Sequence, residues 1–167
     1  MEKKFCHNER VRFEDLDHEA LMGIWWTGIL LRKQAKHFFS NFLSSEAQFN
    51  IMMALKYSEE PLTQNELGEQ LLVDKSNITG LLDRMEKAGL LRRKNVPDDR
   101  RCYHIELTNA GRKILDKVEQ PYRNHVKKLM AIFSKDEIGD ITRYMTRLQN
   151  SVVAAESAAF AEQANRS

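Results

Sequence analysis

The chain has 167 residues, of which 26 are basic and 24 acidic, so its formal charge is only +2 and it is not a grossly basic protein. This length fits one domain, or one compact lobe with added dimerisation helices. The sequence contains no run of 18 apolar residues, so no membrane-spanning helix is expected. The first ten residues lack the apolar core of a secretory signal, and two cysteines without such a signal predict a reduced, cytoplasmic protein.

Two helices are expected first. One runs from Asp17 to about Phe39, with apolar residues along its length and cations near its end, where the helix dipole favours them. Ser45 begins a capping box that ends at Gln48 and opens the second helix, which continues through Leu55. We expect the first helix to serve dimerisation and the second to pack under the segment that follows.

The stretch from Thr63 to Gly111 predicts, in this order, a helix, a turn, a second helix, a hairpin and the start of a third helix. Thr63 and Glu66 form a capping box, which predicts a short helix over Gln64–Leu72. Asp74 is a suitable N-cap for the next helix and Gly89 a suitable stop. The apolar face of this second helix consists of Ile78, Leu81, Leu82 and Met85.

Polar side chains near the start of that second helix point away from its apolar face. They are Lys75, Ser76, Asn77 and Thr79. Small hydrogen-bonding groups at the exposed N-terminal end of such a helix suit insertion into the major groove of DNA. The pattern therefore predicts DNA binding.

A basic hairpin follows. Residues 90–94 and the alternating apolar residues from Tyr103 to Leu107 predict two strands, and residues 96–101 predict a turn with Arg100 and Arg101 at its tip. A solvated turn is the alternative interpretation, but beside a helix-turn-helix such a hairpin is typical of a DNA-binding wing. Residues 74–104 hold 8 basic and 5 acidic residues, a net charge of +3, whereas residues 1–73 hold 8 and 11, a net charge of −3.

Two long helices are expected after the hairpin. Thr108 caps the first, in which Pro121 should produce a kink or a break because proline lacks the backbone donor. Ser134 and Glu137 belong to a third capping box, which opens a last helix with an apolar stripe. A partner chain that covers these stripes is the economical explanation for them.

Three motifs in this order resemble the MarR family of bacterial transcriptional regulators. They are Leu82-Asp83-Arg84 in the second helix, Asp99-Arg100-Arg101 in the hairpin, and Leu107-Thr108-Asn109-Ala110-Gly111 after it. The resemblance covers nearly the whole chain. It implies a mainly α homodimer with a small β-wing, in which a winged helix-turn-helix lobe stands on a helical dimerisation base formed by the N- and C-terminal helices.

The same resemblance implies residue roles and partners. Ser76, Asn77 and Thr79 would face base edges or phosphates of a pseudo-palindromic operator in double-stranded DNA. Arg101 would enter the minor groove and Asp99 would hold the wing in shape. Arg84 and Arg93 would contact the DNA backbone or brace the wing; a structural salt bridge of Arg84 with Asp83 or Glu86 is the alternative. The expected division is 1–42 for dimerisation, 43–107 for DNA binding and 108–167 for dimerisation.

Two kinds of regulatory signal are considered, a small effector and an oxidant. Relatives bind effectors in a crevice between the dimer helices and the winged lobe, so a small aromatic or phenolic effector is expected to release or adjust a repressor. The aromatic residues that could line such a crevice are Trp25, Trp26, Phe38, Phe39 and Phe42, although aromatic residues at helical spacing more often belong to the core. Oxidant sensing through Cys6 is an alternative mechanism.

Other classes of function find little support. The five histidines have no metal-ligand spacing, so no metal and no cofactor is expected. No nucleotide-binding loop or hydrolase motif occurs, which argues against an enzyme. A winged-helix adapter that binds proteins instead of DNA is the remaining alternative, and the polar helix face and the arginine-bearing turn argue against it.

Overall fold

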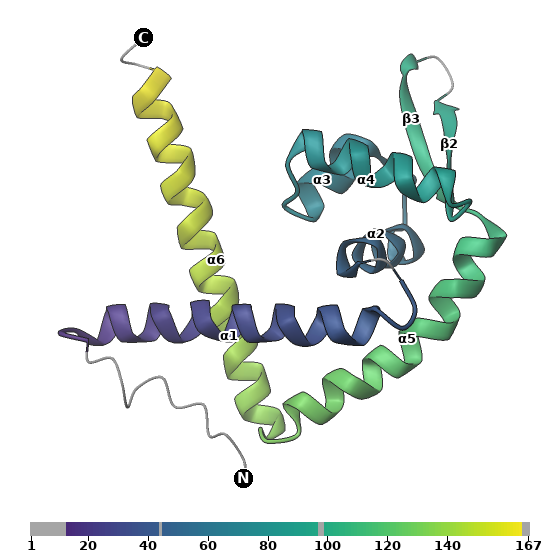
Figure 1. The fold of residues 1–167 in the computed structure, drawn as a ribbon. Coiled ribbons are helices and arrows are strands. Elements are labelled where there is room, and N and C mark those ends of the chain that lie inside the picture. The colour runs from purple at the N-terminus through teal and green to yellow at the C-terminus, as the bar shows by residue number, and fades with distance from the viewer. Residues whose placement is uncertain (1–12, 44, 97–98, 165–167) are drawn as a thin grey trace. The chain divides into compact units, whose positions relative to one another are not determined.

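The computed structural model describes residues 13–43, 45–96 and 99–164. The side chains of residues 96, 99–102 and 160–164 are also outside the description. Within the described part, six helices accompany one three-stranded antiparallel sheet (Figure 1). The prediction of a mainly α fold with a small β-wing is therefore confirmed.

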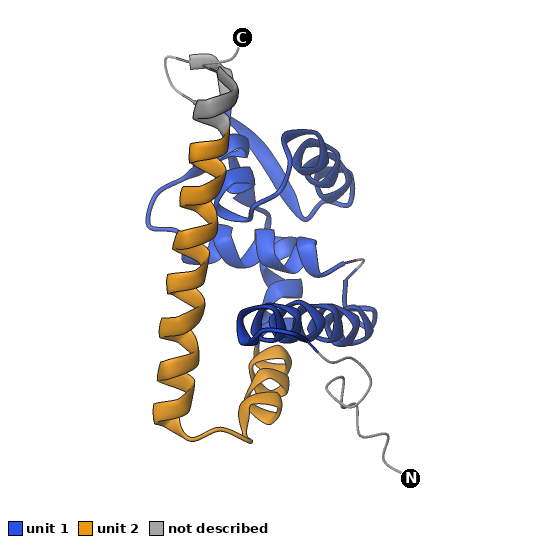
Figure 2. Cartoon of the chain, turned by 90° about the vertical axis from the view of Figure 1, so that its left-hand side faces the viewer, with its two compact units in different colours: residues 1–119 blue, residues 120–167 orange. Residues whose placement is uncertain are grey.

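The chain divides into two compact units (Figure 2). The first ends at Glu119 and the second begins at Gln120. The first unit contains all three strands of the described residues, so the winged lobe can be described by itself. The division by role at residues 42 and 107 stays a prediction.

Two helices open the first unit, α1 (Leu16–Phe39) and α2 (Glu46–Tyr57). Asp15 caps α1, because its carboxylate accepts a hydrogen bond from the His18 backbone N–H at 2.5 Å. Ser45 caps α2 as predicted, and its hydroxyl accepts from the backbone N–H of Gln48 at 3.4 Å.

The helix-turn-helix consists of α3 (Gln64–Gln70) and α4 (Lys75–Lys87). The capping box at the start of α3 is confirmed. However, α3 ends two residues earlier than expected, because Leu72 adopts a left-handed backbone with φ +52° and is 90% exposed. The prediction that Leu72 belongs to this helix is wrong, whereas Gly89, with φ +70°, does follow the end of α4.

The sheet has the order β1-β3-β2, from β1 (Leu62–Thr63), β2 (Leu91–Val96) and β3 (Asp99–Leu107). The expected turn over residues 96–101 is too wide. The ladder continues past an irregularity after Asn95 and pairs Val96 with Asp99, so Arg100 and Arg101 belong to β3.

Two long helices complete the chain, α5 (Asn109–Met130) and α6 (Lys135–Ala164). Thr108 caps α5 and the capping box of Ser134 and Glu137 opens α6, both as predicted. Of the kink or break expected at Pro121, the break does not occur: α5 stays helical through this residue, because proline removes only one hydrogen bond from the ladder, and the kink stays a prediction.

The core of the first unit lies where α2, α3, α4, the sheet and the start of α5 meet. In Figure 1, α2 lies between α1 and the α3–α4 pair. The fully buried side chains include Ile51 and Met52 of α2, Leu67 of α3, Leu82 and Met85 of α4, Leu91 of β2, and Leu115 and Val118 of α5. This packing holds α4 by one face and leaves its other side to solvent.

Candidate nucleic-acid interface

Helix α4 is held in the lobe by its apolar face, as the sequence predicts. Ile78, Leu81, Leu82 and Met85 are all buried. Lys75, Ser76 and Asn77, in the first turn, are exposed. The lobe therefore presents the N-terminal end of α4 as a polar surface.

The start of α4 differs in one detail from the prediction. Asp74 occupies the N-cap position, but its side chain makes no capping hydrogen bond. Its carboxylate instead accepts a 3.5 Å contact from the Asn77 side-chain amide. Backbone N–H groups in the first turn of α4 thus have no side-chain cap, and such groups attract anions.

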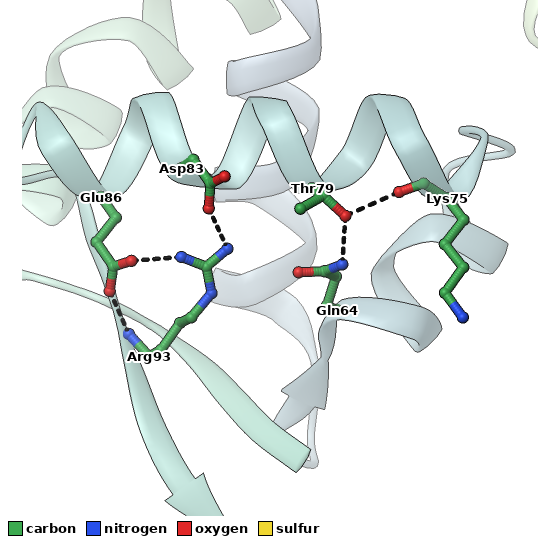
Figure 3. A network of polar contacts seen from close by, with 6 residues as sticks. All are labelled: Gln64, Lys75, Thr79, Asp83, Glu86 and Arg93. Carbon is green, nitrogen blue, oxygen red and sulfur yellow. Dashed lines mark hydrogen bonds and ion pairs between the residues drawn. The ribbon is translucent and has the colours of Figure 1, made fainter. Parts of the chain in front are cut away.

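Thr79 lies one turn further along and is half-buried. Its hydroxyl donates to the backbone carbonyl of Lys75 at 2.9 Å and accepts from Nε2 of Gln64 at 2.7 Å. Figure 3 shows Gln64 reaching this hydroxyl from the first turn of α3. Sequence reasoning placed Thr79 on the DNA-facing surface and missed Gln64 altogether.

Arg93 of β2 fastens the wing to α4 (Figure 3). Its guanidinium forms ion pairs with Asp83, at 2.6 Å, and with Glu86. Its backbone N–H also donates to the Glu86 carboxylate at 3.0 Å. Of the two roles expected for Arg93, the structure shows the contacts of a brace.

Arg84 does not form the salt bridge that was its alternative role. Asp83 and Glu86, the two expected partners, are engaged with Arg93. Arg84 is exposed and forms no ion pair within the part of the chain that the structure describes. Its guanidinium is therefore available for a partner outside the described residues.

The wing carries further positive charge next to α4. Arg92 and Lys94 of β2 are exposed, and both pair with Glu106 of β3, at 2.8 Å and 3.3 Å. The pKa of Glu106 lies below its usual value. The hydrogen bond from Arg92 is the largest cause, and the hydrogen bond from Lys94 adds to it, whereas partial burial acts in the opposite direction and raises the pKa. The side chains of Asp99, Arg100 and Arg101, which carry the predicted wing contacts, lie outside the described residues.

The Leu-Thr-x-x-Gly motif has a structural explanation. The Thr108 hydroxyl donates to the Gly89 carbonyl at 2.6 Å, after the end of α4, and accepts from the Gly111 N–H at 3.0 Å. A Cβ on Gly111 would lie only 2.0 Å from the Leu90 carbonyl oxygen. The motif therefore clamps the end of α4 against the start of α5.

The five aromatic candidates for effector binding occupy different environments. Phe39 is buried and packs on Phe49, with ring centroids 4.8 Å apart. Phe38 stacks on Phe42, at 5.5 Å, while Trp25 is exposed and Trp26 is half-buried. Only Phe39 of the five lines a cavity of about 560 Å³ between α1 and α2. The cavity is lined by Ile29, Arg32, Lys33, Lys36, Phe39, Ser40, Ser45, Glu46 and Ala47.

The remaining candidate sites add no chemistry to this picture. Cys6 lies outside the described residues. Among the described residues, no group of three or more metal-binding side chains could hold an ion. None of the described helices is long and apolar enough to span a lipid bilayer.

A helix-turn-helix whose second helix is exposed at its start, with a basic two-stranded hairpin beside it, defines a winged helix-turn-helix protein. Comparison with known proteins agrees. A model of the MarR family matches residues 45–103. The organic hydroperoxide resistance transcriptional regulator of Bacillus subtilis (strain 168) is 30% identical over 117 residues, which are 70% of this chain and 75% of that protein. The chain belongs to the MarR family, whose members are DNA-binding transcriptional regulators and not enzymes.

Further relatives extend the match. The transcriptional regulator PecS of Dickeya dadantii (strain 3937) is 27% identical over 87% of this chain and 89% of its own length. The MarR-family regulator AbsC of Streptomyces coelicolor has the same fold, with a TM-score of 0.78, 20% identity, and coverage of 86% and 99% of the two chains. MepR of S. aureus, solved as a complex with DNA, gives a TM-score of 0.70 at 19% identity over 83% and 99%.

Proposed function

We propose that this chain is a sequence-specific repressor that binds a pseudo-palindromic operator as a homodimer and responds to a small molecule. The observation that carries the proposal is the first turn of α4, where Lys75, Ser76 and Asn77 are exposed to solvent beside the basic wing. A helix presented in this way fits the major groove, which displays a distinct hydrogen-bond pattern for each base pair.

Each part of the lobe has a role in this proposal. Ser76, Asn77 and Lys75 contact base edges and phosphates, and Arg84 contacts the DNA backbone. The wing reaches the adjacent minor groove through Arg101, with Arg100 on phosphates and Asp99 supporting the strand. The net charge of one lobe is small, so strong binding requires two lobes on one operator.

Homodimerisation is supported by the apolar surface that one chain leaves uncovered. Leu21, Ile24 and Ile29 of α1 are exposed, and so are Val126 and Leu129 of α5. No residue from 120 to 159, the described part of the second unit with side chains, is buried. Surfaces of this kind mark contacts between chains.

Selection from a pool of random duplex DNA by the purified protein, read by sequencing, tests the proposal. The expected result is a palindrome whose half-sites are about 10 bp apart, centre to centre. Retention of DNA without any enriched sequence would refute it and favour the alternative of a protein-binding adapter.

For the effector we propose an anionic aromatic molecule in the cavity between α1 and α2. Arg32, Lys33 and Lys36 line this cavity together with the apolar Ile29 and Phe39. None of these three cations belongs to an ion pair among the described residues. A carboxylate beside these cations and a ring against Phe39 would match the lining, in which the three cations outnumber the one carboxylate, that of Glu46.

A matched pair of probes tests the effector class. We expect 4-hydroxybenzoate to raise the thermal midpoint and to release the selected operator, and phenol, which lacks the carboxylate, to do neither. The response should be lost in a variant with Arg32→Gln and Lys33→Gln. Equal responses to both probes would contradict an anionic site.

Oxidant sensing through Cys6 remains a second proposal for the signal, and the match to an organic hydroperoxide regulator favours testing it. Peroxide should release the operator from the wild-type protein and not from Cys6→Ser. A response that persists in Cys6→Ser would refute this mechanism. A cytoplasmic location follows from the proposed role and is part of the proposal.

A further inference from the structure

Gln64 is the first residue of α3, yet its side chain is directed to α4. Its Nε2 lies 2.7 Å from the Thr79 hydroxyl, and the side chain is half-buried in this contact. Figure 3 shows the carboxamide below α4, on the same side of the helix as the Lys75 side chain. Gln64 belongs neither to the family motifs nor to the polar face of α4.

The hydrogen-bond pattern shows which partner holds the other. A threonine hydroxyl has one hydrogen, and that of Thr79 is donated to the Lys75 carbonyl at 2.9 Å. The orientation of the hydroxyl is thereby fixed by the backbone of α4, and an acceptor lone pair is left for Gln64. Thr79 is the fixed partner, and the longer side chain of Gln64 is the one that is positioned.

The held carboxamide still has unused hydrogen-bonding capacity. A glutamine amide has two N–H donors and a carbonyl acceptor, and only one donor is used by Thr79. Within the described part of the chain, the Oε1 atom and the second N–H of Gln64 have no partner. An amide that presents a donor and an acceptor side by side can pair with the N7 and N6 edge of adenine, and its donor alone can bind a phosphate oxygen.

We propose that Gln64 donates a hydrogen bond to an acceptor on the operator DNA, and that Thr79 is its positioning residue. The inference rests on the proposed function, since it assumes that α4 enters the groove. The proposal changes the role of Thr79. The sequence indicated a direct contact with DNA, whereas here Thr79 positions Gln64, which makes the contact from α3. DNA recognition then involves both helices of the helix-turn-helix.

A double-mutant cycle on the selected operator tests this coupling. Gln64→Met keeps the length and packing of the side chain and removes the amide, and Thr79→Val keeps its shape and removes the hydroxyl. We expect each variant to bind about 3- to 10-fold more weakly, as the loss of one hydrogen bond implies. The affinity of the double variant should equal that of the weaker-binding single variant, because both changes remove the same contact.

Controls separate this role from a structural one. Asn65→Ala, at the exposed neighbouring position of α3, should bind as the wild type does. The dependence of affinity on salt should stay unchanged in Gln64→Met, because a neutral amide releases no counterions, whereas Lys75→Ala should lower it. Thermal midpoints verify that all variants are folded at the temperature of the assay.

The outcomes are distinct. A loss confined to one base-pair position identifies a base edge as the acceptor, and a uniform loss identifies a phosphate; both support the inference. Wild-type affinity of Gln64→Met, or additive losses in the double variant, would overturn it. Failure of the wild-type protein to bind any selected duplex would instead overturn the proposed function.

Discussion

At the scale of single residues, Gly111 is the position where the fold leaves no room for a side chain. A Cβ there would lie 2.0 Å from the Leu90 carbonyl oxygen, a backbone atom that cannot move without shifting the clamp between α4 and α5. We expect Gly111→Ala to lower the free energy of unfolding by about 2–3 kcal/mol. Chemical denaturation of the full chain measures this loss.

Gly139 is the matched control for Gly111. It lies in α6, where a Cβ would meet no atom within 4 Å, so Gly139→Ala should be neutral or stabilise the helix by about 0.5–1 kcal/mol. Equal effects of the two substitutions would show that the close approach at Gly111 is absent in solution.

Leu72 is the opposite case, because its backbone is strained and its side chain is 90% exposed. A left-handed conformation costs a residue with a Cβ about 1–2 kcal/mol. Leu72→Gly removes this cost at the expense of some entropy, and we expect a net gain of about 0.5–1 kcal/mol in the free energy of unfolding. Thermal and chemical denaturation would detect it, and a loss of stability would mean that Leu72 packs against something.

At the scale of elements, the brace between β2 and α4 distinguishes two arginines that the sequence treats alike. Arg93 is neutralised by Asp83 and Glu86, whereas Arg84 has no ion pair among the described residues. We expect Arg84→Ala to reduce the slope of log affinity against log salt by about one, and Arg93→Ala to leave it unchanged. Arg93→Ala should instead destabilise the lobe by about 1 kcal/mol.

Binding titrations at several salt concentrations, combined with denaturation, separate the two effects. The prediction is wrong if Arg93→Ala lowers the salt slope as much as Arg84→Ala does. That result would mean that Arg93 leaves its carboxylates and binds phosphate in the complex.

The same elements show what could be predicted from sequence. Helix starts were predictable because Ser45, Thr63 and Ser134 cap their own helices through hydrogen bonds to residues only a few positions away in the sequence. The short strand β1 was missed because it is a strand only through its pairing with Ile105 and His104, far along the chain. A local pattern cannot contain such a pairing.

The same distinction between local patterns and contacts distant in sequence applies to the candidate site. The outward polar face of α4 follows from helical spacing, and the structure reproduces it at Lys75, Ser76 and Asn77. The contacts of Gln64 with Thr79 and of Arg93 with Asp83 join elements 10 to 15 residues apart. Their residue types are common on any surface, so only the fold shows that they meet.

At the scale of the whole molecule, the uncovered apolar surface determines how the chain can act. One lobe carries little net charge and one recognition helix, so under the proposed function both affinity and the recognition of a palindrome would depend on a second chain. In the second unit, Val126 and Leu129 are exposed one turn apart on α5. In the proposed dimer they are covered by the partner, and a carboxylate at either position would be buried there without a counter-charge.

We therefore expect the variant with Val126→Asp and Leu129→Asp to be monomeric at concentrations where the wild-type chain is a dimer, as sedimentation velocity would measure. Its circular dichroism should stay largely helical, because the winged lobe has its own core. Its affinity for the full operator should fall by more than about 100-fold, since one lobe alone loses the contribution of the second half-site. Lys128→Asp, an exposed charge on the same helix, is the control and should leave the mass unchanged. If the double variant remains a dimer, these α5 residues are not at the interface; if the wild-type chain is itself a monomer and binds a single half-site, the dimer is refuted.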